Sequence, residues 1–242
     1  MARDTASDGP FALPDAWALL PLVRLLHLGS PALPIGAYSY SQGLEQVVDD
    51  GTVHDAASAL RWIGDVLELV VARSEAPILW RLLLAVRDGE WGAYARRNAW
   101  FRASRETAEL RAETEQMGAS LAKLAGELDL IDASARRALE RAAPVTLPAA
   151  YALAVRGFAV PADASLAAYV WSWLENQTLA AIKLVPLGQV AGQRLLAALG
   201  AKIPNVVAMA MTLADDDIST FAPGLALASS RHETQYTRLF RS

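Results

Sequence analysis

Apolar side chains recur every three or four residues over most of the chain, and this spacing restricts the fold more than any other feature of the sequence. In the segment 55–73, for example, Leu60, Ile63, Leu67 and Val70 fall on one face of a helix. Alternating apolar and polar runs of useful length, which would predict strands, are absent from the sequence. The chain is therefore predicted to be all-α.

Glycine and proline divide the periodic segments from one another. Gly29 is a suitable C-cap for the first predicted helix, and Ser74 with Pro77 predicts the N-cap and first turn of another. Helices are expected over 17–28, 44–48, 55–73, 78–86, 91–101, 105–128, 132–142, 149–158, 164–184, 187–199, 205–213 and 225–239. No linker, repeat or composition shift separates two halves, so the pattern predicts one bundle of roughly ten helices.

Length and composition indicate the extent of this bundle and the amount of apolar surface it has. Residues 1–15 are predicted to be a disordered N-terminal tail, and residues 16–242 a single all-helical domain. The chain has 53% hydrophobic residues and a mean hydropathy of +0.22, which exceeds what a lone bundle of this size needs to bury. Partners are expected to cover the excess, and we predict a homodimer.

Charge and composition also exclude several classes of function. The net charge of −4 argues against nucleic-acid binding, and the absence of cysteine excludes disulfides and thiolate metal sites. His27, His54 and His232 are isolated and form no ligand pair, so we predict no metal site and no cofactor. The sequence contains no phosphate-binding loop of the P-loop type. We therefore do not expect an enzyme.

The sequence contains no obvious membrane-spanning or export segment. The longest run without a formal charge, 25–44, is interrupted by two prolines and three glycines, whereas a spanning helix needs about 20 predominantly apolar residues. The first ten residues lack the apolar core of a signal peptide. We expect a cytoplasmic protein that does not bind membranes.

Arginine and glutamate alternate in the most charged segment, 96–115. Three of their pairs stand four residues apart, where side chains meet on a helix surface. These pairs are Arg102 with Glu106, Arg105 with Glu109, and Arg111 with Glu115. We interpret the segment as a solvated helix face.

A stiff polar loop at 30–45 interrupts the helical pattern, with the sequence Ser-Pro-Ala-Leu-Pro-Ile-Gly-Ala-Tyr-Ser-Tyr-Ser-Gln-Gly-Leu-Glu. Two prolines fix the backbone and Gly36 permits a turn. The tyrosine rings are of the type enriched in interfaces, but they could equally fill the core while the serines cap backbone groups. A glutamate at the start of the next helix could likewise act as a cap or contact a partner. The candidate partner-contact residues here are Tyr38, Ser39, Tyr40, Ser41, Gln42 and Glu45.

The C-terminal residues are also patterned, although chain ends usually drift toward featureless polar composition. His232, Tyr236 and Phe240 would form one stripe on a helix. This stripe could dock on the chain's own bundle or in another subunit, and the nearby arginines favour the second alternative. On that interpretation, removal of 235–242 leaves the helical core folded. The candidate partner-contact residues of this region are Arg231, His232, Glu233, Gln235, Tyr236, Arg238 and Phe240.

Three segments together resemble the UreF family of urease accessory proteins. They are the loop at 30–45, the segment 185–194 (Val-Pro-Leu-Gly-Gln-Val-Ala-Gly-Gln-Arg), and the C-terminal residues 222–242. They occur in the family's order, and the second segment adds Arg194 to the candidate partner-contact residues. The segment 146–155 departs from the pattern, because many relatives carry a histidine-led, glycine-containing sequence there.

The resemblance implies an all-α, dimeric, cytoplasmic protein that helps to assemble the nickel centre of urease. It implies three partners: a UreD-type accessory protein (also called UreH), the nickel-binding GTPase UreG, and apo-urease through their complex. The chain would be an assembly chaperone without chemistry of its own, and nickel binding would belong to the complex. The alternative is a GTPase-activating protein that supplies Arg194 or Arg231 to UreG, although lone arginines more often form structural ion pairs.

Overall fold

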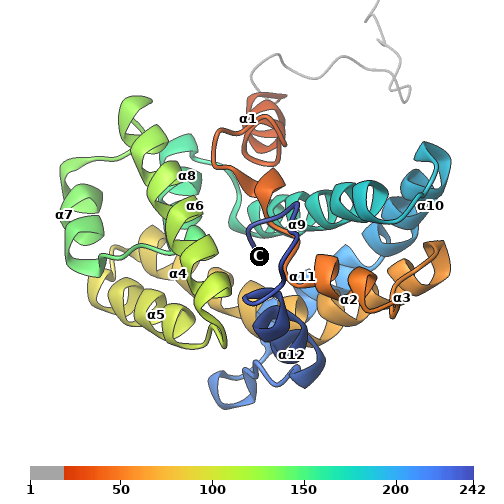
Figure 1. The fold of residues 1–242 in the computed structure, drawn as a ribbon. Coiled ribbons are helices and arrows are strands. Elements are labelled where there is room, and N and C mark those ends of the chain that lie inside the picture. The colour runs from red at the N-terminus through yellow and green to blue at the C-terminus, as the bar shows by residue number, and fades with distance from the viewer. Residues whose placement is uncertain (1–18) are drawn as a thin grey trace, which may run out of the picture.

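The computed structural model describes residues 19–242, so the predicted tail at 1–15 lies outside the described residues. Helices and turns make up this part of the chain, which confirms the all-α prediction (Figure 1). The helices are α1 (Leu20–Leu28), α2 (Leu44–Asp49), α3 (Ala56–Val66), α4 (Ala76–Asp88), α5 (Trp91–Ala103), α6 (Ala108–Glu127), α7 (Ala133–Ala142), α8 (Leu147–Phe158), α9 (Ala162–Leu184), α10 (Gln189–Gly200), α11 (Ile203–Thr212) and α12 (Pro223–His232). A π-helical segment, η3 (Leu67–Glu75), and two 3-10 turns, η2 (Ala37–Ser39) and η4 (Asp215–Asp217), complete the set.

The core is built around α8 and α9. Every residue of α8 from 148 to 155 is buried, and four alanines in this run let α4 and α6 pack closely against it. Gly118 of α6 lies so close to the start of α8 that a Cβ there would be 2.4 Å from the carbonyl oxygen of Val145. The long α9 packs against α1, α2, α4, α10 and α11, and in Figure 1 it runs from the middle of the molecule to α10.

The prediction that Ser74 caps a new helix is wrong, because the helical backbone runs without a break from α3 through η3 into α4. Pro77 has no amide N–H to give to the carbonyl of Arg73. The wider π-helical turn accommodates this gap, and Ser219 donates its N–H to the free Arg73 carbonyl at 3.1 Å. Ser74 is buried within this continuous helical backbone, and Glu75, the last residue of η3, points into the core.

The stretch Gln189–Thr212 is long and apolar enough to cross a membrane by length and composition alone. In the structure a turn at Ala201 and Lys202 divides it into α10 and α11. Both helices pack against α9. A pair of packed helices in a globular domain passes the same test, so this stretch is weak evidence for a membrane segment.

The interpretation of 96–115 as one solvated helix face is wrong. The chain leaves α5 after Ala103 and enters α6 at Ala108, where the Thr107 hydroxyl caps the new helix by accepting the N–H of Leu110 at 3.2 Å. The predicted pairs of residues four apart do not form among the described residues. Arg102 instead pairs with Glu115 at 2.6 Å, and Arg105 is buried beside Glu75 at 3.6 Å.

Candidate partner-binding site at the C-terminal segment

Residues 233–242, called here the C-terminal segment, lie beside α2, α6 and the loop at 30–43, in the middle of the view in Figure 1. The predicted helix over 225–239 ends at His232, so the stripe of His232, Tyr236 and Phe240 does not form. The reason is a competing acceptor. The Glu45 carboxylate accepts the backbone N–H groups of Leu239 at 2.6 Å and Phe240 at 2.9 Å, in place of helical carbonyls.

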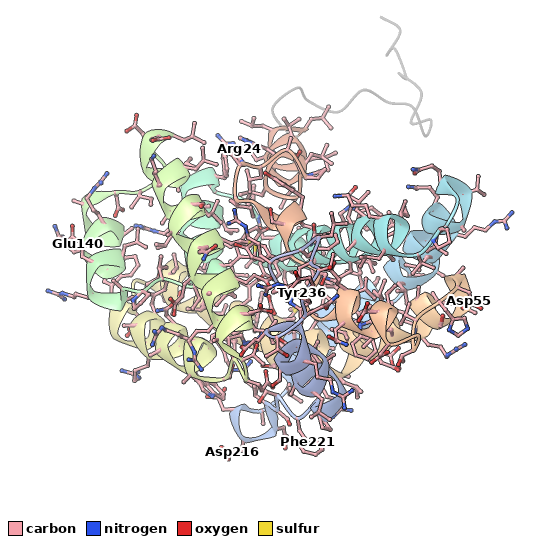
Figure 2. All side chains as sticks on the ribbon, in the orientation of Figure 1. Arg24, Asp55, Glu140, Asp216, Phe221 and Tyr236 are labelled. Carbon is pink, nitrogen blue, oxygen red and sulfur yellow. The ribbon has the colours of Figure 1, made fainter. Side chains whose placement is uncertain are left out.

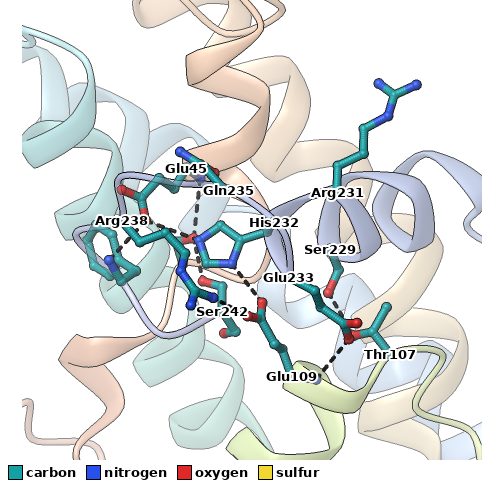
Figure 3. A network of polar contacts seen from close by, with 12 residues as sticks. Glu45, Thr107, Glu109, Ser229, Arg231, His232, Glu233, Gln235, Arg238 and Ser242 are labelled. Atoms are coloured by element: carbon teal, nitrogen blue, oxygen red, sulfur yellow. Dashed lines mark hydrogen bonds and ion pairs between the residues drawn. The ribbon is translucent and has the colours of Figure 1, made fainter.

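His232 lies fully buried between two carboxylates (Figure 3). Its Nδ1 is 2.6 Å from Oε2 of Glu109 on α6, and its Nε2 is 3.1 Å from Oε2 of Glu45 on α2. Ionised carboxylates only accept hydrogen bonds, so both contacts are satisfied when the ring is an imidazolium that donates from both nitrogens. Glu109 also accepts a hydrogen bond from Nη1 of Arg238 at 2.6 Å.

The start of the C-terminal segment is tied to the N-terminus of α6. The Glu233 carboxylate accepts the backbone N–H groups of Ala108 at 2.9 Å and Glu109 at 3.3 Å. A negative charge at a helix N-terminus is favourable because the unpaired N–H groups and the helix dipole point toward it. The hydroxyls of Thr107 and Ser229 meet 2.7 Å apart beside this contact and join α12 to the same helix end (Figure 3).

The last residues of the segment pair with the tyrosine-containing loop. Arg241 donates its N–H to the carbonyl of Ser39 at 2.8 Å. The carbonyl oxygen of Ser242 accepts the N–H of Ser41 at 2.8 Å and the Ser41 hydroxyl at 2.6 Å. The hydroxyl of Ser242 donates to Glu113 of α6 at 2.6 Å.

Glu113 is a buried carboxylate that joins this pairing to the core. Gln42 donates its Nε2 to Glu113 at 2.7 Å and accepts the indole N–H of Trp173 at 2.8 Å. Burial raises the pKa of Glu113 to about 7, although the hydrogen bonds from Ser242 and Gln42 act in the opposite direction. Behind it lies a cavity of about 60 Å³ that is also lined by Glu75 and the buried Arg105, whose Nε has no partner.

Gly43 explains part of the loop motif. Its φ is +78°, a left-handed conformation that side chains disfavour. A Cβ at this position would also approach the backbone nitrogen of Ser229 to 3.2 Å. Glycine therefore lets α12 lie directly against the start of α2, which brings His232 within reach of Glu45.

The structure divides the predicted contact residues into three groups by their exposure to solvent. Buried members, which bind within this chain, are Tyr40, Ser41, Glu45, His232 and Phe240. Exposed members are Tyr38, Arg194, Arg231, Glu233, Tyr236 and Arg238, while Ser39, Gln42 and Gln235 are partly buried. Tyr236 is fully exposed, and Arg194 on α10 contacts none of the other predicted residues by hydrogen bond or ion pair. Contact of any of these residues with a partner stays a prediction.

The preferred interpretation, in which the segment docks into another subunit and its removal leaves the core intact, is wrong for two residues. Phe240 and Ser242 are both buried in this chain. The aromatic ring of Phe240 packs in the main core beside Lys183, whose ammonium group is 5.6 Å from the ring centre. Deleting 235–242 would therefore remove part of the core as well as a surface.

Sequence reasoning missed several residues that hold the segment. The buried or half-buried ones are Thr107, Glu109, Glu113, Trp173 and Ser242. Glu109 and Glu113 stand four residues apart, a spacing that places both on one helix face, but alternating arginines made that face read as solvated. No group of three or more histidine, aspartate or glutamate side chains within residues 19–242 is arranged to hold a metal ion.

Comparisons with known proteins agree on one family. The family model described as UreF matches residues 53–200. The urease accessory protein UreF of Azoarcus sp. (strain BH72) is 57% identical over 230 residues, which cover 94% of this chain and 98% of the relative. UreF of Bordetella parapertussis is 56% identical over 220 residues, covering 90% of this chain and all of the relative. The bifunctional urease accessory protein UreEF of Bordetella bronchiseptica is 56% identical over 224 residues, but the match spans about half of its length, 52%.

Proposed function

The chain belongs to the UreF family of urease accessory proteins, and from this premise we propose that it is a non-catalytic assembly chaperone for urease. It works with a UreD-type (UreH) protein and the GTPase UreG to support GTP-dependent nickel insertion into apo-urease. Nickel is then the cargo of the complex, and this chain contributes contact surfaces. We place the protein in the cytoplasm as a homodimer.

One observation carries the role as a contact surface: the C-terminal segment is irregular, yet both of its ends are firmly held. Glu45, Glu109 and Glu113 hold the backbone and polar groups of the segment. Between these anchors the ring of Tyr236 is fully exposed and the side chain of Leu239 is 66% exposed. A surface fixed before binding loses less conformational entropy when a partner docks, so exposed apolar side chains on an anchored segment suit recognition.

An exposed apolar stripe on α1 supports a further contact. Leu19, Leu22, Val23 and Leu26 follow the helical spacing of three and four residues, and each is at least 45% exposed. Such a stripe is unusual on the free surface of a monomer. It supports the proposal that a second copy or an accessory protein covers part of this molecule.

The fused relative supports a role beside other accessory proteins. Its printed name describes one bifunctional polypeptide, UreEF, of which this chain matches about half. Fusion raises the effective concentration of two modules that act together. We therefore propose that this chain, too, acts next to other urease accessory proteins during maturation.

The test truncates exposed side chains while it leaves the anchors in place. Tyr236→Ala with Leu239→Ala should keep the melting temperature of the chain but weaken co-purification with the UreD-type partner, and urease activation in a co-expression strain should fall. Truncating a central interface aromatic typically costs about 2 kcal/mol or more, which is over tenfold in affinity. Leu69→Ala with Leu128→Ala is the control, because both side chains are apolar and are exposed elsewhere on the surface, by 47% and 45%. Unchanged binding and activation by the double variant would refute the assignment of this surface.

A further inference from the structure

A single buried histidine connects the C-terminal segment to the two helices beneath it. His232 precedes the segment directly, and its two nitrogens contact Glu109 of α6 and Glu45 of α2 (Figure 3). The same two carboxylates hold the segment itself. Glu45 accepts the N–H groups of Leu239 and Phe240, and Glu109 accepts the guanidinium of Arg238. The charge of the histidine therefore bears directly on the contacts that keep the segment in place.

We propose that His232 is a proton-operated latch: as an imidazolium it holds the C-terminal segment on the body of the protein, and its deprotonation at rising pH releases the segment. The closed state has one proton on each ring nitrogen and one carboxylate oxygen facing each. Loss of either proton leaves a ring lone pair directed at a carboxylate oxygen. The two glutamates then lose the cation that lies between them.

The charge balance around the ring gives the direction of the switch. With the imidazolium present, Glu45 and Glu109 face two cations, the ring and Arg238. Without it, Arg238 alone balances two partly or fully buried carboxylates, and it is itself partly exposed to solvent. Among the other charged groups nearby, Glu233 caps α6 and Arg231 extends into solvent on α12. Neither replaces the lost proton.

Glu113 acts in the same direction from the far end of the segment. Its carboxyl group is buried and holds the hydroxyl of Ser242. As the pH rises through about 7 this group acquires a buried negative charge, one helical turn from Glu109. Deprotonation of Glu113 and deprotonation of His232 thus both leave uncompensated negative charge beneath the segment as the solution becomes more alkaline. On the other side of the segment, the ammonium group of Lys183 lies 5.6 Å from the ring centre of Phe240.

The latch has a consequence for recognition, which rests on the function proposed above. Tyr236 and Leu239 are displayed in a fixed position only while the segment is anchored on both sides. Opening would exchange a preformed surface for a flexible one and raise the entropic cost of partner binding. Partner affinity should thus be greater in mildly acidic than in mildly alkaline solution.

The first test uses the intact, isolated protein, so it does not depend on any partner. Hydrogen exchange of the amides of Leu239, Phe240 and Arg241 is measured between about pH 6 and about pH 8, the range in which histidine changes charge, and is corrected for the intrinsic exchange rate at each pH. We expect protection to fall about tenfold or more, because deprotonation removes the contacts of the imidazolium with Glu45 and Glu109, and hydrogen bonds between charged groups are the stronger class. Nitrogen chemical shifts of the His232 ring should report loss of a proton with the same midpoint. Protection that does not change with pH, or a ring that keeps both protons throughout, would overturn the latch.

Variants separate the two titrating groups. His232→Gln, which is neutral at every pH, should show low protection and little pH dependence. His54→Gln is the matched control, since His54 is exposed and contacts the carbonyl of Gly51 far from the segment, and it should behave as the wild type. Glu113→Gln should retain most of the pH dependence. If His232→Gln keeps the full dependence and Glu113→Gln loses it, the histidine is not the switch. A different outcome is that amide protection changes with pH as expected while the protein binds no partner at any pH. That result would refute the proposed function but not the latch.

Discussion

The C-terminal segment and α1 differ in how firmly the rest of the protein holds them. Their secondary structure alone would suggest the opposite order. The segment is irregular, but buried carboxylates accept its backbone N–H groups, and Phe240 and Ser242 are buried. Helix α1 is regular, yet Leu28 is its one buried residue, and the side chain of Leu26 is 65% exposed. Few contacts tie α1 to the body, among them the Arg24 guanidinium, which donates to the carbonyl of Phe158 at 2.6 Å.

The difference shows that regularity does not measure how firmly a segment is held. A helix satisfies its backbone hydrogen bonds within itself, so it can form with little help from the rest of the chain. An irregular segment must find its hydrogen-bond partners elsewhere, and it stays ordered only where those partners are supplied. The glutamates of α2 and α6 supply them here. Removing a support should therefore be costly at the C-terminal segment and nearly neutral at α1.

The largest effect is expected for Glu45→Ala. The change leaves His232 and two backbone N–H groups without their acceptor inside the protein. Breaking a buried ionic contact by removal of one partner costs about 3–5 kcal/mol in the free energy of unfolding. Chemical denaturation at about pH 6 measures it. Glu68→Ala is the control, because its exposed pair with Lys202 should contribute at most about 1 kcal/mol. If both variants lost the same free energy of unfolding, the conclusion that the C-terminal segment is firmly held would be wrong.

Phe240→Ala should have the next largest effect, near the lower end of the usual range for core aromatics, about 3 kcal/mol. The ring is buried in the main core, but it lies on an irregular segment whose backbone can relax into the space left. Phe221→Ala offers a matched truncation of an exposed ring and should change stability by less than about 0.5 kcal/mol. Thermal and denaturant unfolding of both variants check this. A similar result for both rings would mean that the C-terminal segment does not dock as the structure shows.

The pH dependence of stability should come next in size. Burial raises the pKa of Glu113 from its ordinary value to about 7, so the folded state binds a proton that the unfolded state has already released. This contribution is fully present below about pH 4.5 and is lost as the pH rises to about 7, after which it stays constant. We expect a decline of about 3 kcal/mol over that interval.

The decline should be smaller in Glu113→Gln, whose side chain does not titrate. Glu127→Gln, an exposed glutamate on the same helix, is the control and should follow the wild type. Unfolding free energies from denaturant titrations at several pH values give the slopes directly. A wild-type slope that survives in Glu113→Gln would assign the proton to another group.

The sequence predicted the helices far better than it predicted this site, and the reason is the range of the interactions. Apolar periodicity is a local signal, and it located α3, α6 and α9 with shifted ends. Glu45 and His232 are 187 residues apart, so no local pattern could pair them. The family resemblance singled out the loop that contains Glu45 and the C-terminal residues that contain His232. It did not show that these two regions contact each other. The helix predicted to Leu239 failed for the same reason, because its competing acceptor lies on α2.

The smallest effect is expected at α1, and it tests the other half of the comparison. Leu22→Ser with Leu26→Ser changes two exposed side chains, so the free energy of unfolding at low protein concentration should shift by less than about 0.5 kcal/mol for each. If a second copy covers the stripe, stability becomes dependent on protein concentration, because association stabilises the folded state by mass action. Light scattering and denaturation over a hundredfold range of concentration distinguish these cases. A wild-type dimer that the double variant converts to a monomer would show that α1 is held as firmly as the C-terminal segment, by another subunit rather than by its own chain. Loss of stability at every concentration would mean instead that these leucines support the fold of the monomer.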